Sequence, residues 1–120
     1  MDKKEPPIDR NAILRLHKLG GKKLVAQMID LFVKETPKRL QSARDGEKAG
    51  NLEAIERATH SLKTSAGNLG AGEMGRLSAE IEQLAFEKKG EGIPPLLRAL
   101  EQAFSTAAHA LEEEVRTIEP

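Results

Sequence analysis

The sequence contains no cysteine, tryptophan or tyrosine, and only three phenylalanines among its 120 residues. The absence of cysteine excludes disulfides, thiolate metal sites and thiol catalysis. With so few aromatic rings, the core has to be built from aliphatic residues, methionine and alanine, a composition that favours helices over strands. Proteins that bind single-stranded nucleic acid stack bases on aromatic side chains, and this sequence has few of those side chains.

An excess of charge of either sign is also missing. Nineteen basic residues balance nineteen acidic ones, and no segment concentrates the positive charge, so the electrostatic signature of nucleic-acid binding is absent. No apolar run approaches the roughly 18 residues that a membrane-spanning helix needs. The first residues, Met1 to Pro7, lack the apolar stretch of a signal peptide. We therefore expect a cytoplasmic protein that neither binds nucleic acid nor enters a membrane.

The chain is long enough for one domain, and we expect a polar leader over residues 1–8 and a single domain over residues 9–120. Apolar spacing, caps and breakers predict five helices, with a kink or tightened turn at Pro37. Short connections make neighbours antiparallel, so the expected fold is all-α: an antiparallel four-helix bundle with an additional short N-terminal helix. The predicted helices run from Asp9 to about Lys18, from about Lys22 to a break between Asp45 and Asn51, from Leu52 to Leu69, from Met74 to about Lys88, and from Pro94 to Ile118.

The third predicted helix has the most regular apolar seam, and His60 lies away from it. At roughly 100° per residue, His60 is about 130° from the centre of the seam, which predicts an exposed imidazole rather than a core histidine. For an arbitrary histidine, an exposed helix position without a function would be the usual interpretation. The seam follows steps of three and four residues through Leu52, Ile55, Thr59, Leu62, Ala66 and Leu69.

Two cations lie near His60 on the same predicted helix. Lys63 is one turn ahead and Arg57 one turn behind. A neutral imidazole is a good nucleophile at physiological pH, and a nearby cation helps to keep it neutral. The cation would also stabilise a phosphoryl group on the ring, by up to roughly 4 kcal/mol at about 4 Å before desolvation costs. The small residues from Thr64 to Gly67 leave a low surface for a partner protein.

Residues 59–71 resemble the signature of the histidine-containing phosphotransfer (HPt) family, which reads His-x-Leu-Lys-Gly-Ser-Ala/Ser and, two residues later, apolar-Gly-Ala. Similar segments at residues 32–37 and 77–84 extend the resemblance to about residues 9–117. One position departs from the pattern, because Thr64 stands where the family usually has Gly. The matching positions are His60, Leu62, Lys63, Ser65, Ala66, Leu69, Gly70 and Ala71.

The resemblance implies that His60 accepts a phosphoryl group and that Lys63 stabilises it. The family often has a Gln or Glu on the next helix that hydrogen-bonds the other imidazole nitrogen, and Glu82 occupies this position. The helical wheel agrees, because Glu82 follows the seam residue Ile81 just as His60 follows Thr59. Such a carboxylate would fix the tautomer and leave one ring nitrogen free to attack. Thr64 and Gly67 are the expected docking positions, and Arg57 an auxiliary cation.

The function expected from this resemblance is that of a phosphorelay intermediate, which takes a phosphoryl group from one receiver-domain aspartate and passes it to another. The expected partners are response-regulator receivers and a hybrid sensor histidine kinase, with the chain itself a monomer. No metal spacing or ATP-binding loop is present, so Mg²⁺ is expected on the receiver and autonomous kinase activity is not expected.

Two alternatives remain open at this stage. One is direct phosphorylation by an ATP-dependent histidine kinase, as in chemotaxis kinases, although such domains more often have an aromatic residue where Ala71 stands. The other is a helical interaction module that has lost phosphotransfer.

Overall fold

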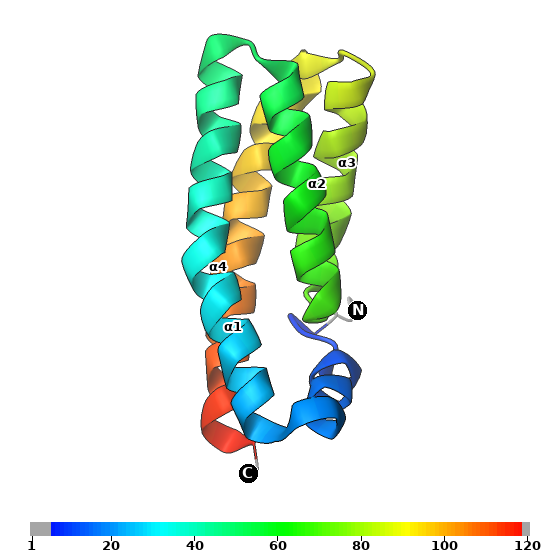
Figure 1. Cartoon of the computed structure of the whole chain (residues 1–120). Coiled ribbons are helices and arrows are strands. Elements are labelled where there is room, and N and C mark those ends of the chain that lie inside the picture. The colour runs from blue at the N-terminus through cyan, green and yellow to red at the C-terminus, as the bar shows by residue number, and fades with distance from the viewer. Residues whose placement is uncertain (1–5, 119–120) are drawn as a thin grey trace, which may run out of the picture.

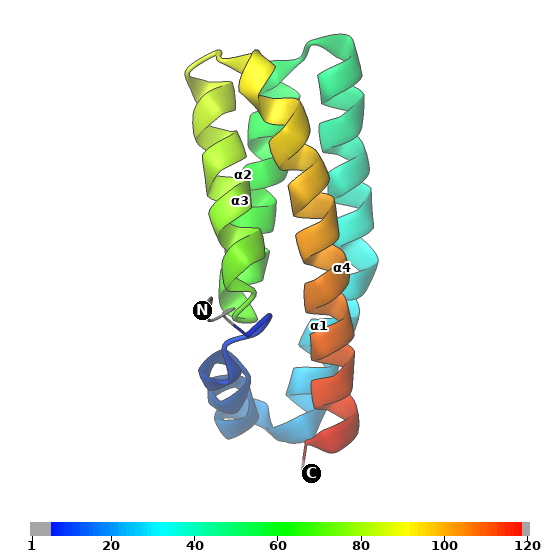
Figure 2. The same ribbon diagram turned by 180° about the vertical axis from the view of Figure 1, so that it is seen from behind.

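The computed structural model describes residues 6–118, and within this range all regular structure is helical. The elements are α1 (Arg10–Ala49), α2 (Leu52–Asn68), α3 (Gly72–Phe86), the short 3₁₀ helix η1 (Gly90–Gly92) and α4 (Ile93–Thr117). Successive helices run in opposite directions (Figure 1), and each packs against its two neighbours in the ring α1–α2–α3–α4. From behind, α4 is seen next to α3 and in front of α1 (Figure 2). The predicted antiparallel bundle is confirmed.

The helix α1 consists of two parts that meet at a glycine. Gly21 has φ 71° and ψ −169°, the one non-helical conformation within α1, and Gly adopts such a positive φ without a Cβ clash. The segment before it turns back across the end of the bundle (Figure 1). The Asp9 carboxylate caps this segment by accepting a hydrogen bond from the Asn11 backbone N–H at 3.0 Å. The additional short N-terminal helix is thus present as predicted.

Two predicted interruptions of α1 differ from the structure in part. Residues around Pro37 keep helical dihedral angles, so there is no tightened turn there. The break predicted between Asp45 and Asn51 is present but shorter, because the helix continues through Gly46 and ends at Ala49. Gly46 stays helical and buried because α2 begins against it: a Cβ at Gly46 would lie 3.0 Å from Ile55 Cγ1. Gly46 therefore allows α1 and α2 to pack closely and does not end the helix.

Three helices end in the same arrangement, with one residue in the left-handed region. Gly50, Gly70 and Lys88 have φ of 66°, 74° and 60°, respectively. At Gly70, the following Ala71 N–H donates to Ala66 O at 2.9 Å, and the Gly70 N–H donates to Gly67 O at 3.3 Å. These paired bonds form a Schellman motif, which satisfies carbonyls that the helix end would leave open. The chain can therefore reverse direction within a few residues.

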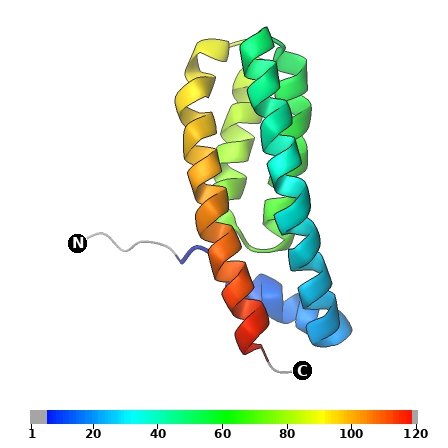
Figure 3. The same cartoon turned by 90° about the vertical axis from the view of Figure 1, so that its left-hand side faces the viewer.

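The core runs the length of the bundle and includes the N-terminal segment. α1 and α4 extend beyond the turn that joins α2 and α3 (Figure 3). The N-terminal segment lies against this turn, where the Asp9 N–H donates to Gly70 O at 2.8 Å. Ile8, which the sequence predicts to lie in a polar leader, is buried in the core; residues 1–5 of that leader lie outside the described range. The largest fully buried side chains include Ile13, Ile55, Leu62, Leu69, Met74, Ile81, Leu97, Leu100 and Leu111.

One buried hydroxyl lacks a partner among the described residues. Ser78 on α3 is fully buried, and its Oγ makes no hydrogen bond there. An unsatisfied buried hydroxyl costs free energy, so Ser78→Ala should raise the free energy of unfolding by up to about 1 kcal/mol in urea denaturation. Thr59→Val is the matched control, because Thr59 is equally buried but its Oγ1 donates to Ile55 O at 2.8 Å. A loss of stability in the Ser78 variant would contradict the prediction.

Candidate functional site

His60 stands on the outer side of α2, with 65% of its side chain exposed. Its neighbour Thr59 is buried, as are Ile55, Leu62 and Ala66, so the predicted seam faces the core and turns His60 to solvent. Asn51 fixes the start of this helix, because its side chain accepts a hydrogen bond from the Ala54 N–H at 3.1 Å. The register of α2 is thus set by its cap and its seam together.

The helix α3 brings a carboxylate to the histidine. His60 Nδ1 lies 2.6 Å from Glu82 Oε2, and Lys63 Nζ lies 2.6 Å from Glu82 Oε1. The Glu82 side chain is mostly buried, with 19% exposed, while the Lys63 side chain is 41% exposed. The sequence placed these three residues on facing flanks, and the structure brings them into contact. It also shows what the sequence did not: Lys63 binds the carboxylate, which thus bridges the two α2 side chains.

The electrostatics of Glu82 reflect this double contact. Partial burial raises the pKa of its carboxyl, but the hydrogen bonds from Lys63 and His60, and the charges of both, outweigh burial and lower the pKa below its usual value. Because folding lowers this pKa, the contacts add stability above the ordinary carboxyl pKa. That stability is lost as the pH falls through the folded value. Glu82 is thus an anion throughout the neutral range.

An ionised Glu82 determines which imidazole nitrogen is free. A carboxylate only accepts hydrogen bonds, so Nδ1 carries the proton and donates it to Glu82 Oε2. In the neutral ring, Nε2 then holds the lone pair, on a side chain that is 65% exposed. The arrangement fixes the tautomer and orientation of an exposed imidazole, which is what a nucleophilic histidine requires.

The remaining predicted site residues surround His60 in different ways. Arg57 forms an ion pair with Glu53 at 3.5 Å, and no hydrogen bond or ion pair joins it to His60 among the described residues. Thr64 is exposed, and its Oγ1 donates back to the His60 carbonyl at 3.3 Å. Gly67 is also exposed, and a Cβ there would meet nothing within 4 Å. The surface beyond His60 is therefore open and low, while the Arg57 guanidinium is engaged elsewhere.

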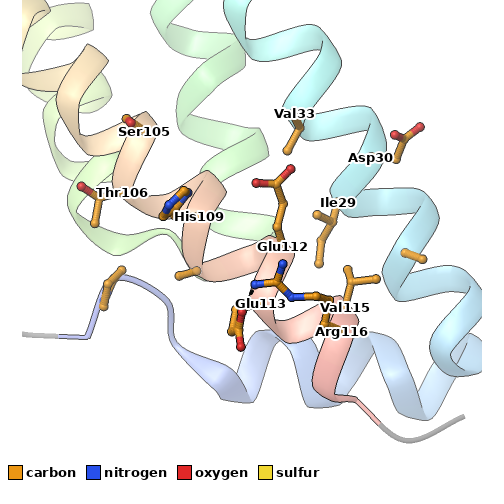
Figure 4. A pocket seen from close by; sticks show the side chains of 13 residues that line it. Ile29, Asp30, Val33, Ser105, Thr106, His109, Glu112, Glu113, Val115 and Arg116 are labelled. Carbon is orange, nitrogen blue, oxygen red and sulfur yellow. Dashed lines mark hydrogen bonds and ion pairs between the residues drawn. The ribbon is translucent and has the colours of Figure 1, made fainter.

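Other polar features of the chain lie apart from this site. His109 lines a groove of about 1020 Å³ between α1 and α4 (Figure 4), to which α2 and α3 contribute no residue. Residues 6–118 contain no group of three potential metal ligands, and none of their helices is long and apolar enough to cross a membrane. The chemistry-bearing cluster on α2 and α3 sits on an exposed face rather than in this groove.

The fold and the site define a class of protein before any comparison: a small antiparallel bundle that displays an imidazole held by a carboxylate on its surface. The family model of the Hpt domain matches residues 27–118, and the chain belongs to this family. A role in phosphotransfer within two-component signalling follows from that membership. The family works with receiver domains and hybrid kinases. A search of the curated proteins gives no match.

Two solved structures share the fold. Histidine-containing phosphotransfer protein B (HptB) from Pseudomonas aeruginosa PAO1 superposes with a TM-score of 0.88 at 22% identity, over 97% of this chain and 100% of that one. The HPT domain of a sensor hybrid histidine kinase from Shewanella gives a TM-score of 0.78 at 13% identity, over 95% and 97% of the two chains. At these identities the similarity establishes the architecture, including the N-terminal segment.

Proposed function

We propose that this protein is a phosphorelay intermediate whose phosphoacceptor is His60. The observation that supports this most strongly is the 2.6 Å contact between His60 Nδ1 and Glu82 Oε2, which leaves Nε2 as the exposed nucleophile. An exposed histidine with no function has no need of a mostly buried carboxylate to orient its ring. Membership of the Hpt family supplies the reaction class.

The proposed reaction transfers a phosphoryl group between two proteins. Nε2 of His60 attacks the phosphorus of an aspartyl phosphate on a receiver domain, the P–O bond to the aspartate breaks, and the aspartate leaves as a carboxylate. An N–P bond forms, and the Nδ1 proton stays between His60 and Glu82 throughout. A second receiver aspartate reverses these steps. Mg²⁺ bound by the receiver, rather than by this chain, neutralises the phosphoryl oxygens, so His60 mainly supplies position and a nucleophile.

Lys63 has two roles in this scheme. Before transfer it balances the negative charge of Glu82. The carboxylate therefore attracts the Nδ1 proton of His60 less strongly. After transfer, the phosphoryl oxygens on Nε2 carry more negative charge than Glu82 and compete for the ammonium. We expect Lys63 to move from Glu82 to the phosphoryl oxygens, or to contact both. Arg57 is the auxiliary cation of this proposal, and it has to leave Glu53 to contribute.

The Lys63 role gives a direct prediction. Lys63→Ala should slow transfer to His60 and shorten the phosphohistidine lifetime by up to about fivefold, because a partly exposed ion pair of up to about 1 kcal/mol is lost. Lys63→Arg should retain most of the activity, because a guanidinium of the same charge can reach the same oxygens. The measurement is a transfer and hydrolysis time course. Equal rates for the three proteins would show that this charge is irrelevant.

The experiment that tests the proposed function uses a panel of purified receiver domains, each phosphorylated on its aspartate. Mixing this protein with them should give it an acid-labile, alkali-stable phosphate, and a second unlabelled receiver should remove it. A parallel reaction with ATP and histidine kinase domains, without receivers, tests direct phosphorylation. If no receiver transfers and His60 stays unmodified, the protein is an interaction module rather than a relay.

A further inference from the structure

Four large apolar side chains are exposed in the described range, and one of them is close to His60. Phe86, the last residue of α3, is 66% exposed; the other three are Leu14, Leu19 and Leu31. An exposed aromatic side chain leaves a large apolar area in water, and aromatic side chains are the residues that most often dominate protein interfaces. Phe86 is one of only three aromatic residues in the chain, and Phe32 and Phe104 pack against each other in the bundle.

The position of Phe86 follows from its helix. It comes four residues after Glu82, which places it about 6 Å further along α3 and about 40° around the same flank. Glu82 itself touches His60. Since α2 and α3 are antiparallel, Phe86 lies beside the turn of α2 that precedes His60, the turn of Glu56. The aromatic ring and the imidazole therefore belong to one continuous surface.

The size of a protein interface decides whether a partner reaches Phe86. A standard interface buries about 800 Å² on each partner, which corresponds to a patch with a radius of about 16 Å. Direct transfer centres this patch on His60, so it covers Phe86. Leu31 lies on a different side of α2: it lines a groove between α1 and α2 with Ser65 and Asn68, which follow His60 by about 7.5 Å and 12 Å along α2. The α3 helix contributes no residue to this groove, so Leu31 belongs to the α1 side of the surface and Phe86 to the α3 side.

The α3 flank also has the shape that an approaching protein needs. One flank of α3 carries Gly75, Ala79, Glu82 and Phe86, at intervals of three and four residues. The first two are small, and a Cβ at Gly75 would lie 3.8 Å from Ala66 Cβ on α2. Across from them, Gly67 leaves open space. The surface is thus low beyond His60 on one side and ends in a protruding ring on the other.

We propose that Phe86 is the main apolar contact for the receiver domain, which sits astride α2 and α3 with His60 at its centre. This inference rests on the proposed function, because the partner is the receiver that donates the phosphoryl group. Phe86 acts in binding and specificity: its ring enters an apolar recess on the receiver while the low surface at Gly67 and Gly75 admits the receiver backbone. It takes no part in the bond changes at Nε2.

The test compares Phe86→Ala with Leu31→Ala, which removes an exposed apolar side chain of similar exposure outside the centre of the patch. Two donors are used: phosphorylated receivers from a purified panel, and phosphoramidate, a small donor that needs no docking surface. Phe86→Ala should lower the ratio of receiver-driven to phosphoramidate-driven labelling at least about tenfold, through KM, as truncation of an interface aromatic does. Leu31→Ala should change it less than about twofold. Phe86→Leu should recover part of the loss.

The outcomes separate the two proposals. If wild-type protein accepts phosphate from receivers and Phe86→Ala does so with the same KM, the Phe86 contact is wrong and the phosphorelay function stands. If Leu31→Ala has the larger effect, the receiver sits over α1 and α2 instead, which also overturns the inference. If neither donor labels wild-type His60, the proposed function itself fails. Circular dichroism and thermal unfolding of each variant exclude a loss of fold.

Discussion

Replacing His60 with glutamine is expected to abolish phosphorylation of this protein by every receiver, a loss of at least about a thousandfold that ends at the detection limit. The amide has no nucleophilic lone pair comparable to that of imidazole, so no N–P bond forms. Glutamine is the most informative replacement because its side-chain N–H₂ can still donate to Glu82, which is mostly buried and would otherwise lose a partner. The fold should therefore be retained within about 0.5 kcal/mol of unfolding free energy.

The measurement is labelling by a phosphorylated receiver, followed by acid and alkali stability of the label. Wild type and the His60→Gln variant are compared at equal concentration, with urea denaturation as the control for stability. His109→Gln provides a matched control, because His109 is also exposed but lines the groove between α1 and α4. It should be labelled like wild type. Label that survives in the His60 variant would contradict the assignment.

The second large effect concerns stability rather than chemistry. Gly70→Ala should lower the free energy of unfolding by about 2–5 kcal/mol, from two causes. The left-handed backbone at φ 74° disfavours any residue with a Cβ by about 1–2 kcal/mol. That Cβ would also lie 2.6 Å from Asp9 O, so the N-terminal segment would have to move away from the α2–α3 turn, at about 1–3 kcal/mol.

Gly67→Ala is the matched control for this stability effect. Gly67 is three residues earlier in the same motif, it lies within α2, and a Cβ there has open space. Alanine should therefore stabilise α2 by about 0.5–1 kcal/mol. The two variants thus change stability in opposite directions in the same urea titration, although each adds a single methyl group. Equal and small effects would show that the contact between Asp9 and Gly70 contributes little.

Periodic features were predictable from the sequence because they depend on local spacing. The seam of α2 is fixed by positions three and four residues apart, and it sufficed to place His60 outside the core. The family resemblance pointed to Glu82, and the α3 seam through Ile81 independently placed it on the facing flank. The Asp9 cap and the end of the first helical segment at Gly20-Gly21 likewise follow from short-range chemistry. The resemblance of the residues around His60 to the Hpt pattern added a prediction of the reaction.

Features that depend on tertiary contact were not predictable in this way. Gly46 looked like a breaker, but the approach of α2 keeps it helical. The tightened turn at Pro37 is missing, and the residues Thr36 and Leu40 beside it are both buried in the bundle. Lys63 was expected beside the imidazole, yet its nearest charge is the carboxylate that α3 brings in. Phe86 could have been noticed as an aromatic one turn after Glu82, but its exposure is known only from the packed structure.

The N-terminal segment makes the folded unit longer than the part of the chain that the family model matches. The family model begins at residue 27, yet Ile8, Ala12, Ile13 and Val25 all belong to the buried core. Arg10 further ties this segment to Glu114 near the end of α4, at 3.0 Å. Transplanting residues 27–118 into another signalling protein would carry over His60, Lys63 and Glu82 but remove the Asp9 N–H that donates to Gly70 O at the α2–α3 turn. For this protein, a graft that keeps the bundle closed has to start before Ile8.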